Sequence, residues 1–171
     1  HMQITPDGKQ LAVSCGDSGQ ADLIDLATRK SARLVSLGED PEIFDISADG
    51  KTLYVTNEED SELGIVDLAS GKRTGEIKVG GEPEGVKIAA DGKTIAATRT
   101  GDDQKGDLLL IDAATGTTRV VPPPAPDGIL WAQEPSADGK SLLCLGLNTY
   151  GFLQLVDLDL VRRRAAEGAR P

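Results

Sequence analysis

Acidic residues recur directly after proline at three places in the sequence, and carboxylates repeated in this way could bind a cation. The three pairs are Pro41-Glu42, Pro83-Glu84 and Pro126-Asp127. If repeated units surround a common axis, equivalent residues meet near it, so these acids would form a ring at a channel mouth. Such a ring could hold a calcium ion or a basic group of a ligand. The alternative is that proline followed by an acid only marks the start of a strand at a solvated rim.

A second set of acids lies in polar loops between apolar segments. Its members are Asp17, Glu58, Glu59, Asp60, Asp102 and Asp103. These loops differ in length and content, as recognition loops on a rigid scaffold do, so they could form a calcium or partner site. The same composition is equally typical of any solvated acidic loop. Because the acids lack the spacing of a calcium-binding loop, we assign no metal ligand among them.

A third set of acids has a structural interpretation. One aspartate closes an aliphatic pair in each of four segments: Asp25, Asp67, Asp112 and Asp157. We expect their carboxylates to accept hydrogen bonds from backbone N–H groups of the turn that follows.

Other features of the sequence argue against catalysis and against two classes of partner. The net charge of −10 disfavours nucleic acid and anionic membranes, and no apolar run approaches the ~18 residues of a membrane span. His1-Met2 resembles a vector remnant, and without His1 the sequence has no histidine to serve as metal ligand or general base. Cys15 and Cys144 are far apart in the sequence, and we expect both to be small buried hydrophobes. No nucleophile elbow, phosphate loop or dinucleotide fingerprint is present, so we predict no catalytic residue and no cofactor.

The elements that must position these residues are repeated. Asp-Gly-Lys occurs four times, beginning at Asp7, Asp49, Asp91 and Asp138, at intervals of 42, 42 and 47 residues. In one unit, alternation over 43–47 predicts a strand, Asp-Gly predicts a hairpin turn, and 52–56, 63–67 and 73–79 complete a set of four strands. Four antiparallel strands in about 42 residues are a propeller blade. A continuous sandwich would give no reason for a fixed period, and the repeat length excludes a helical or leucine-rich solenoid.

We therefore predict an all-β fold of four β-propeller blades, each with four antiparallel strands, within a single domain over 1–171. The expected blades cover approximately 2–37, 38–79, 80–121 and 122–171.

The second unit resembles a known repeat family. Tyr54-Val55-Thr56-Asn57 spells the tetrapeptide of the YVTN β-propeller repeat, and the segment 41–67 is similar to its consensus. The other units depart from it, at 12–15, 96–99 and 143–146. The resemblance implies a bacterial propeller and a periplasmic or cell-surface location. It also implies likeness to lactonase-like proteins and to the large subunits of amine dehydrogenases.

Four blades raise the question of closure. Propellers of this family usually close with seven or eight blades, and four is near the geometric minimum. An open arc exposes apolar faces and strand edges at its two ends. Two interpretations follow: two copies associate head to tail as a homo-oligomer with an eight-bladed ring, or the chain is a fragment of a longer propeller.

The function expected from these features is that of a non-catalytic binding or interaction module that assembles with itself. One alternative is a fragment of an enzyme propeller, such as a lactonase-like hydrolase, with a site completed by further blades. Another is a structural repeat protein of the cell envelope. The sequence does not distinguish a protein ligand from a small molecule.

Overall fold

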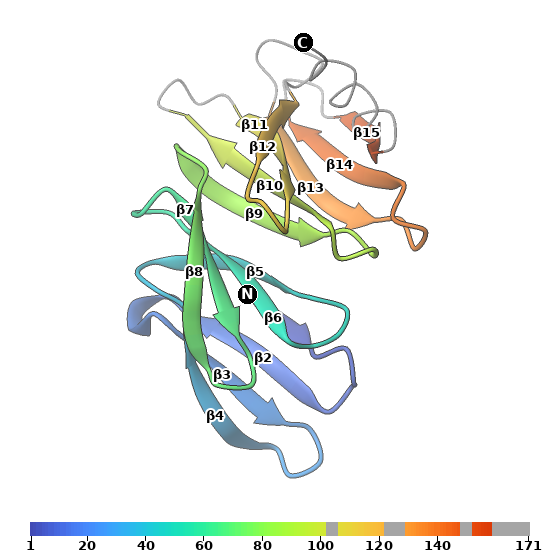
Figure 1. Cartoon of the computed structure of the whole chain (residues 1–171). Helices are drawn as coiled ribbons and strands as arrows, with labels where there is room; N and C mark the ends of the chain where they lie inside the picture. The colour runs from blue at the N-terminus through green and yellow to red at the C-terminus, as the bar shows by residue number, and fades with distance from the viewer. Residues whose placement is uncertain (102–105, 122–128, 148–151, 159–171) are drawn as a thin grey trace.

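The computed structural model describes residues 1–101, 106–121, 129–147 and 152–158. Within these ranges the fold is all-β, and it consists of four antiparallel sheets that follow one another in sequence order (Figure 1). This arrangement confirms the predicted fold class. Among the described residues, no helix has both the length and the apolar character needed to cross a membrane.

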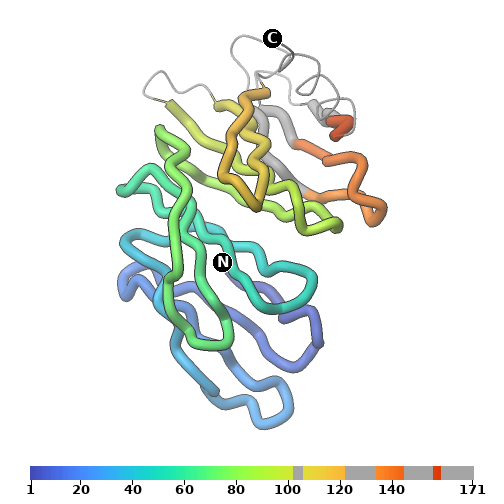
Figure 2. Tube along the Cα trace, in the orientation of Figure 1, coloured from blue at the N-terminus to red at the C-terminus, as the bar shows by residue number. Residues whose placement is uncertain are grey.

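Each sheet is a simple meander in which neighbouring strands are consecutive in the chain (Figure 2). Sheet 1 contains β1 (Met2–Ile4), β2 (Gln10–Cys15), β3 (Gln20–Asp25) and β4 (Lys30–Ser36). Sheet 2 contains β5 (Pro41–Ile46), β6 (Thr52–Asn57), β7 (Glu62–Asp67) and β8 (Lys72–Lys78). Sheet 3 contains β9 (Glu82–Ile88), β10 (Thr94–Thr100), β11 (Gly106–Asp112) and β12 (Thr118–Val121). Sheet 4 contains β13 (Ile129–Pro135), β14 (Ser141–Leu147) and β15 (Phe152–Asp157), so three of its four predicted strands lie in the described part of the chain.

The Asp-Gly-Lys segments form the hairpin turns between the first two strands of each sheet. In the second repeat, Asp49 Oδ1 accepts hydrogen bonds from Ser47 Oγ at 2.7 Å and from the Lys51 N–H at 3.1 Å. Gly50 has a φ of 70°, in the left-handed region that glycine enters without a steric penalty. The turn therefore needs both residues, the aspartate to hold it and the glycine to close it.

Apolar cores lie between successive sheets. We call the side of a sheet that faces the following sheet its forward face, and the opposite side its backward face. The core between sheets 1 and 2 contains Ala12, Ala21, Leu23, Val35 and Leu37 from the first repeat and Phe44, Ile46, Leu53, Val55, Val66 and Leu68 from the second. The next core contains Leu63 and Val79 from the second repeat and Val86, Ile95, Ala97, Leu109 and Ile111 from the third. The core before sheet 4 contains Ala89, Ala96, Leu108 and Leu110 from the third repeat and Leu142, Cys144, Val156 and Leu158 from the fourth.

The first strands of the sheets lie next to one another, as the inner strands of propeller blades do. β5 contacts β9, and β9 contacts β13. Buried Asp45 connects three sheets here: its carboxylate accepts hydrogen bonds from Gln3 Nε2 and from the Ile88 N–H, both at 2.7 Å. A buried carboxylate requires such partners, because leaving it unpaired would be costly.

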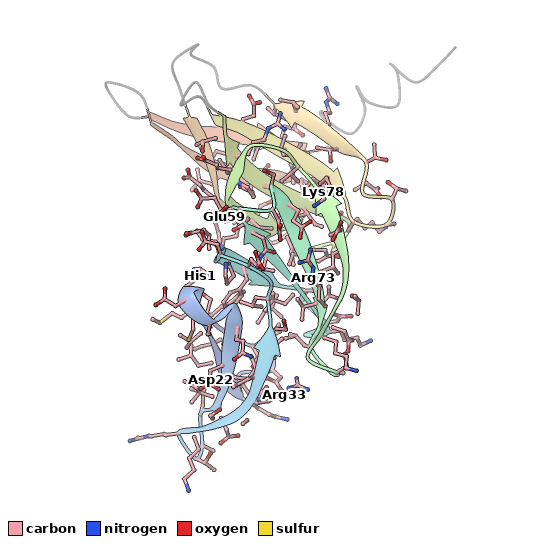
Figure 3. The ribbon with its side chains drawn as sticks, turned by 90° about the vertical axis from the view of Figure 1, so that its left-hand side faces the viewer. His1, Asp22, Arg33, Glu59, Arg73 and Lys78 are labelled. Carbon is pink, nitrogen blue, oxygen red and sulfur yellow. The ribbon has the colours of Figure 1, made fainter. Side chains whose placement is uncertain are left out.

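Sheet 2 also contains a buried ion-pair network. The Glu62 side chain is only 1% exposed, and it pairs with Arg73 and with Lys78 Nζ, the latter at 2.5 Å. Both basic residues lie on β8, which pairs with the β7 strand of Glu62 (Figure 3). The network fixes the outer pair of strands in the second sheet.

Candidate functional site

Acidic side chains from sheets 2 and 3 gather where the inner strands begin. Asp40 precedes β5, Glu42 lies on β5, and Glu58 lies in the loop between β6 and β7. One carboxylate oxygen from each of these three residues lies within 4.8 Å of the others. In the part of the chain that the structure describes, this is the one such group of potential metal-ligating side chains.

Two acids of the neighbouring sheet extend the group. Glu82 and Glu84 lie on β9, and the Thr100 hydroxyl is 3.4 Å and 3.0 Å from their respective carboxylate oxygens. We define the acidic mouth as Asp40, Glu42, Glu58, Glu82 and Glu84. A hollow of about 330 Å³ lies beside it, lined by Glu58, Glu59, Ser61, Gly81 and Glu82.

The carboxylates of the acidic mouth act on one another. Partial burial raises the pKa of Glu58, and the nearby charges of Glu42, Glu82, Asp40 and Glu84 raise it further. Like charges that approach this closely disfavour the ionised form. The arrangement attracts cations or basic side chains, but crowding of carboxylates alone assigns no reaction.

The acids predicted from the sequence divide among several places. Glu42, Glu84 and Glu58 come together in the acidic mouth, Glu59 lines its hollow, and Asp60 is exposed on the same loop. Asp17 is exposed in the 3-10 turn Gly16–Ser18, away from the mouth of sheets 2 and 3. Asp102, Asp103 and Asp127 lie outside the described residues.

Asp40 and Glu82 are members of the acidic mouth that the sequence analysis missed. A signal for them was present, because each precedes the proline of a pair already noted: Asp40-Pro41-Glu42 and Glu82-Pro83-Glu84. The motif that recurs in these two repeats is therefore acid-proline-acid. The proline starts the inner strand and leaves an acid on each side of it.

The strand-end aspartates have neighbours of the kind expected for structural turns. Asp25 accepts hydrogen bonds from the Thr28 N–H and hydroxyl, both at 2.7 Å. Asp67 accepts one from the Ser70 N–H at 2.6 Å, and Asp112 accepts one from the Thr115 N–H at 2.8 Å. Hydrogen bonds from these three turns lower the pKa of all three aspartates. Asp157 is exposed at the end of β15.

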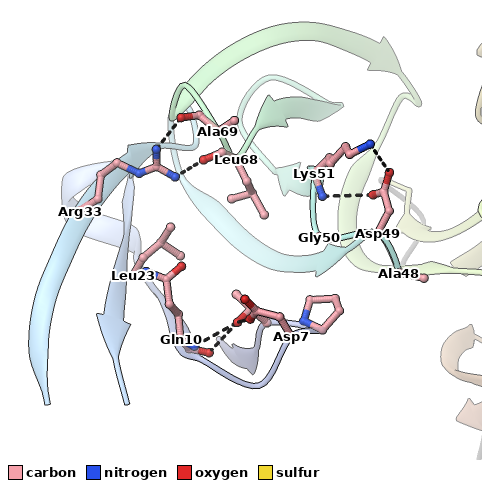
Figure 4. Close-up of a pocket in the computed structure, with 12 residues that line it drawn as sticks. Asp7, Gln10, Leu23, Arg33, Ala48, Asp49, Gly50, Lys51, Leu68 and Ala69 are labelled. Carbon is pink, nitrogen blue, oxygen red and sulfur yellow. Dashed lines mark hydrogen bonds and ion pairs between the residues drawn. The ribbon is translucent and has the colours of Figure 1, made fainter. Parts of the chain in front are cut away.

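The largest hollow lies between sheets 1 and 2 at the end with the Asp-Gly-Lys turns, with a volume of about 410 Å³ (Figure 4). Its charged groups are bound to its own walls. Arg33 donates hydrogen bonds to the carbonyl oxygens of Leu68 and Ala69, and Lys51 Nζ lies 3.7 Å from Asp49. A hollow of about 310 Å³ sits at the equivalent place between sheets 2 and 3, so such hollows accompany the blade junction.

The backward face of sheet 1 is apolar and uncovered in the chain. We define the open face as Met2, Ile4, Leu11, Val13, Ile24 and Leu26. Met2 is 66% exposed, Ile4 57% and Leu26 40%. Exactly 42 residues later come Phe44, Ile46, Leu53, Val55, Val66 and Leu68, all at most 5% exposed in the core between sheets 1 and 2. The open face thus has the residue types of a blade contact, without the sheet that would cover it.

The two cysteines differ, and the expectation that both are buried was wrong for one. Cys144 is buried in the core between sheets 3 and 4, where burial raises its pKa to about 11. Cys15 is exposed, because it ends β2 directly before the 3-10 turn.

Comparison with known proteins places the fold but not a family. No protein-family model matches the chain, and no curated protein matches it. Among solved structures, it is similar to hydrazine synthase from Kuenenia stuttgartiensis, with 29% identity and a TM-score of 0.79 over 94% of this chain and 46% of that one. It is also similar to the Cps50 (Swd1) β-propeller domain from Myceliophteria thermophila, with 22% identity and a TM-score of 0.76 over 93% of this chain and 51% of that one. A third is the dihydro-heme d1 dehydrogenase NirN in complex with DHE, with 21% identity and a TM-score of 0.71 over 92% of this chain and 34% of that one. The chain thus spans about half or less of these solved chains, and its sheets have the arrangement of propeller blades.

Proposed function

We propose that this chain is a non-catalytic β-propeller module of the YVTN-repeat type, which functions by docking other protein surfaces against its blades. The observation that carries the proposal is the open face. Six apolar residues stand there at positions whose counterparts one repeat later are buried in a blade contact. Exposed apolar surface of this kind is typical of an interaction site.

The YVTN assignment has support from the contacts of the tetrapeptide. The Thr56 hydroxyl accepts from the Ile43 N–H at 3.0 Å and donates to the Ile43 carbonyl at 3.1 Å, bridging the irregular pairing of β5 with β6. Asn57 Nδ2 donates to the carbonyl oxygens of Leu37 and Glu39, in the link between sheets 1 and 2. Threonine and asparagine thus have structural work at these positions, which is the reason a blade repeat would carry them.

The thermal midpoint as a function of protein concentration tests the proposal. Association through the open face stabilises the folded chain by mass action, so the midpoint should rise with concentration. Ile4→Lys/Leu26→Lys should remove that dependence, because it places charges on the open face. Val120→Lys is the matched control, since Val120 is 46% exposed but lies on sheet 3. The same concentration dependence in all three proteins would contradict the proposal.

An enzyme fragment with a metal-dependent site is the second candidate, and the acidic mouth is the observation in its favour. Calcium titration followed by thermal melting separates the two functions. A large rise in midpoint that Glu58→Gln abolishes would favour the metal-dependent site. An unchanged midpoint would favour the interaction module.

A further inference from the structure

The identity of the surface that covers the open face can be inferred from the repeat, and this inference rests on the proposed function. Within the chain, each backward face is covered by the forward face of the preceding sheet. The surface that fits the open face is therefore the forward face of another blade. Sheet 4 has such a face with no following sheet in the described part of the chain.

The forward face of sheet 4 can be traced through equivalent residues. Ala12, Tyr54, Ala96 and Leu143 each stand two positions after the last lysine-following residue of their turn, directly after Leu11, Leu53, Ile95 and Leu142. The first three contribute to the cores between successive sheets. Leu143 is 38% exposed and pairs with Leu155 across the sheet. We define the end face as the forward face of sheet 4 around Leu143.

We propose that the end face of one copy docks on the open face of a second copy, and that two such contacts close a ring of eight sheets. Head-to-tail contacts need two different surfaces on each copy, and a closed pair satisfies both surfaces in both copies. Eight blades lie within the range of known propellers.

The length of the similar structures supports a second copy as the occupant. The chain covers 51% of the Cps50 propeller domain and 46% of the hydrazine synthase chain. Those chains therefore contain about as much again beyond the aligned blades, and a second copy supplies that amount.

Polar contacts at the existing junction indicate how the second copy would be held. Arg33 of sheet 1 donates to the carbonyl oxygens of Leu68 and Ala69 in the second repeat. Leu26 and Ala27 occupy the same positions one repeat earlier, at the edge of the open face. A donor from the docked copy can use these carbonyls in the same way.

Asp22 is the position of the open side of sheet 1 that departs from the pattern. It pairs with Val13 on β2 and with Leu34 on β4, among the apolar residues, and its repeat counterpart is Gly64 (Figure 3). Its carboxylate accepts a hydrogen bond from Ser31 Oγ at 2.6 Å. Docking would desolvate this charge, so Asp22 should weaken the contact. Asp22→Ala is consequently a variant that should strengthen association.

The mass of purified variants, measured by sedimentation over a concentration series, tests the inference. Wild-type chain should be dimeric. Ile4→Lys/Leu26→Lys and Leu143→Lys should each raise the dimer Kd by at least about 100-fold, while Val120→Lys leaves it unchanged. An equimolar mixture of the two blocked variants should form a heterodimer, because one intact end face meets one intact open face. Asp22→Ala should lower the Kd about 3- to 10-fold.

The outcomes separate this inference from the proposed function. A Leu143→Lys variant that dimerises like wild type, beside a monomeric Ile4→Lys/Leu26→Lys variant, would mean that two open faces meet; this would overturn the head-to-tail contact and leave the proposed function intact. A wild-type association that Ile4→Lys/Leu26→Lys does not affect would overturn both. A weaker dimer in Asp22→Ala would also overturn the inference, and circular dichroism of each variant confirms that it is folded.

Discussion

Asn57 and Arg99 hold the same position in successive repeats, and each donates a side-chain hydrogen bond to the backbone carbonyl 20 residues earlier in the chain. Asn57 Nδ2 bonds to the Leu37 carbonyl, and the Arg99 guanidinium bonds to the Val79 carbonyl. Leu37 and Val79 are themselves equivalent, 42 residues apart, at the exits of sheets 1 and 2. Two chemically different donors therefore fasten the same link between blades.

Asn57→Ala should destabilise the chain, because two buried carbonyl oxygens lose their donor. The expected loss is about 2 kcal/mol of unfolding free energy, or roughly 4–8 °C in thermal midpoint for a chain of this size. Thermal melting followed by circular dichroism gives the measurement. Asp17→Ala, in an exposed turn, is the control and should leave the midpoint unchanged within about 1 °C. Equal midpoints for both variants would show that Asn57 does not hold the link.

Arg73→Ala and Lys78→Ala should differ in their effect although both residues pair with Glu62. The Arg73 side chain is 26% exposed and that of Lys78 63%, so Arg73 provides more of the compensation for the buried carboxylate. Arg73→Ala should cost about 2–3 kcal/mol, because it leaves a buried charge partly uncompensated, and Lys78→Ala less than about 1 kcal/mol. Urea unfolding of both variants checks the order. A larger loss for Lys78→Ala would contradict it.

Glu58→Gln should stabilise the chain at neutral pH. The pKa of Glu58 is raised in the folded state, so the folded chain binds a proton more tightly than the unfolded chain. The charge of Glu58 therefore lowers stability above that pKa, and the penalty disappears as the pH falls through it. The variant should melt about 1–2 °C above wild type at pH 7 and equal to it at acidic pH. Glu59→Gln is the control on the same loop, and a gain that persists at low pH would refute the electrostatic cause.

The two thiols should react at different rates with a disulfide reagent. Cys15 is exposed, whereas burial raises the pKa of Cys144 to about 11 and shields it between sheets 3 and 4. In native chain at pH 8, one thiol should react quickly and the other at least about 100-fold more slowly. Cys15→Ser should abolish the fast phase. Two fast thiols in the native chain would show that sheet 4 does not stay packed on sheet 3.

Much of the fold could be predicted because it depends on local chemistry that repeats. The Asp-Gly turns and the alternation of apolar residues are local signals, and they located the strands of the second repeat closely. Asp45 shows the limit of this reasoning. Alternation places it on a side of β5 opposite Phe44, but only the packing of three sheets reveals that its carboxylate is buried between Gln3 and Ile88.

The acidic mouth could be predicted in part for a related reason. Glu42 and Glu84 recur in register, so their proximity to a common axis follows from the repeat. The contribution of Glu58 depends on how the loop after β6 folds back toward β5. That is a long-range contact, and the sequence of the loop does not separate Glu58 from Glu59 and Asp60.

The molar mass of the wild-type chain in solution, measured by light scattering beside Ile4→Lys/Leu26→Lys, tests the central claim most directly. The claim is that the open face of sheet 1 is a docking surface. The account predicts twice 17.9 kDa for wild type and 17.9 kDa for the variant. A wild-type mass of 17.9 kDa at the highest concentration reached would contradict it.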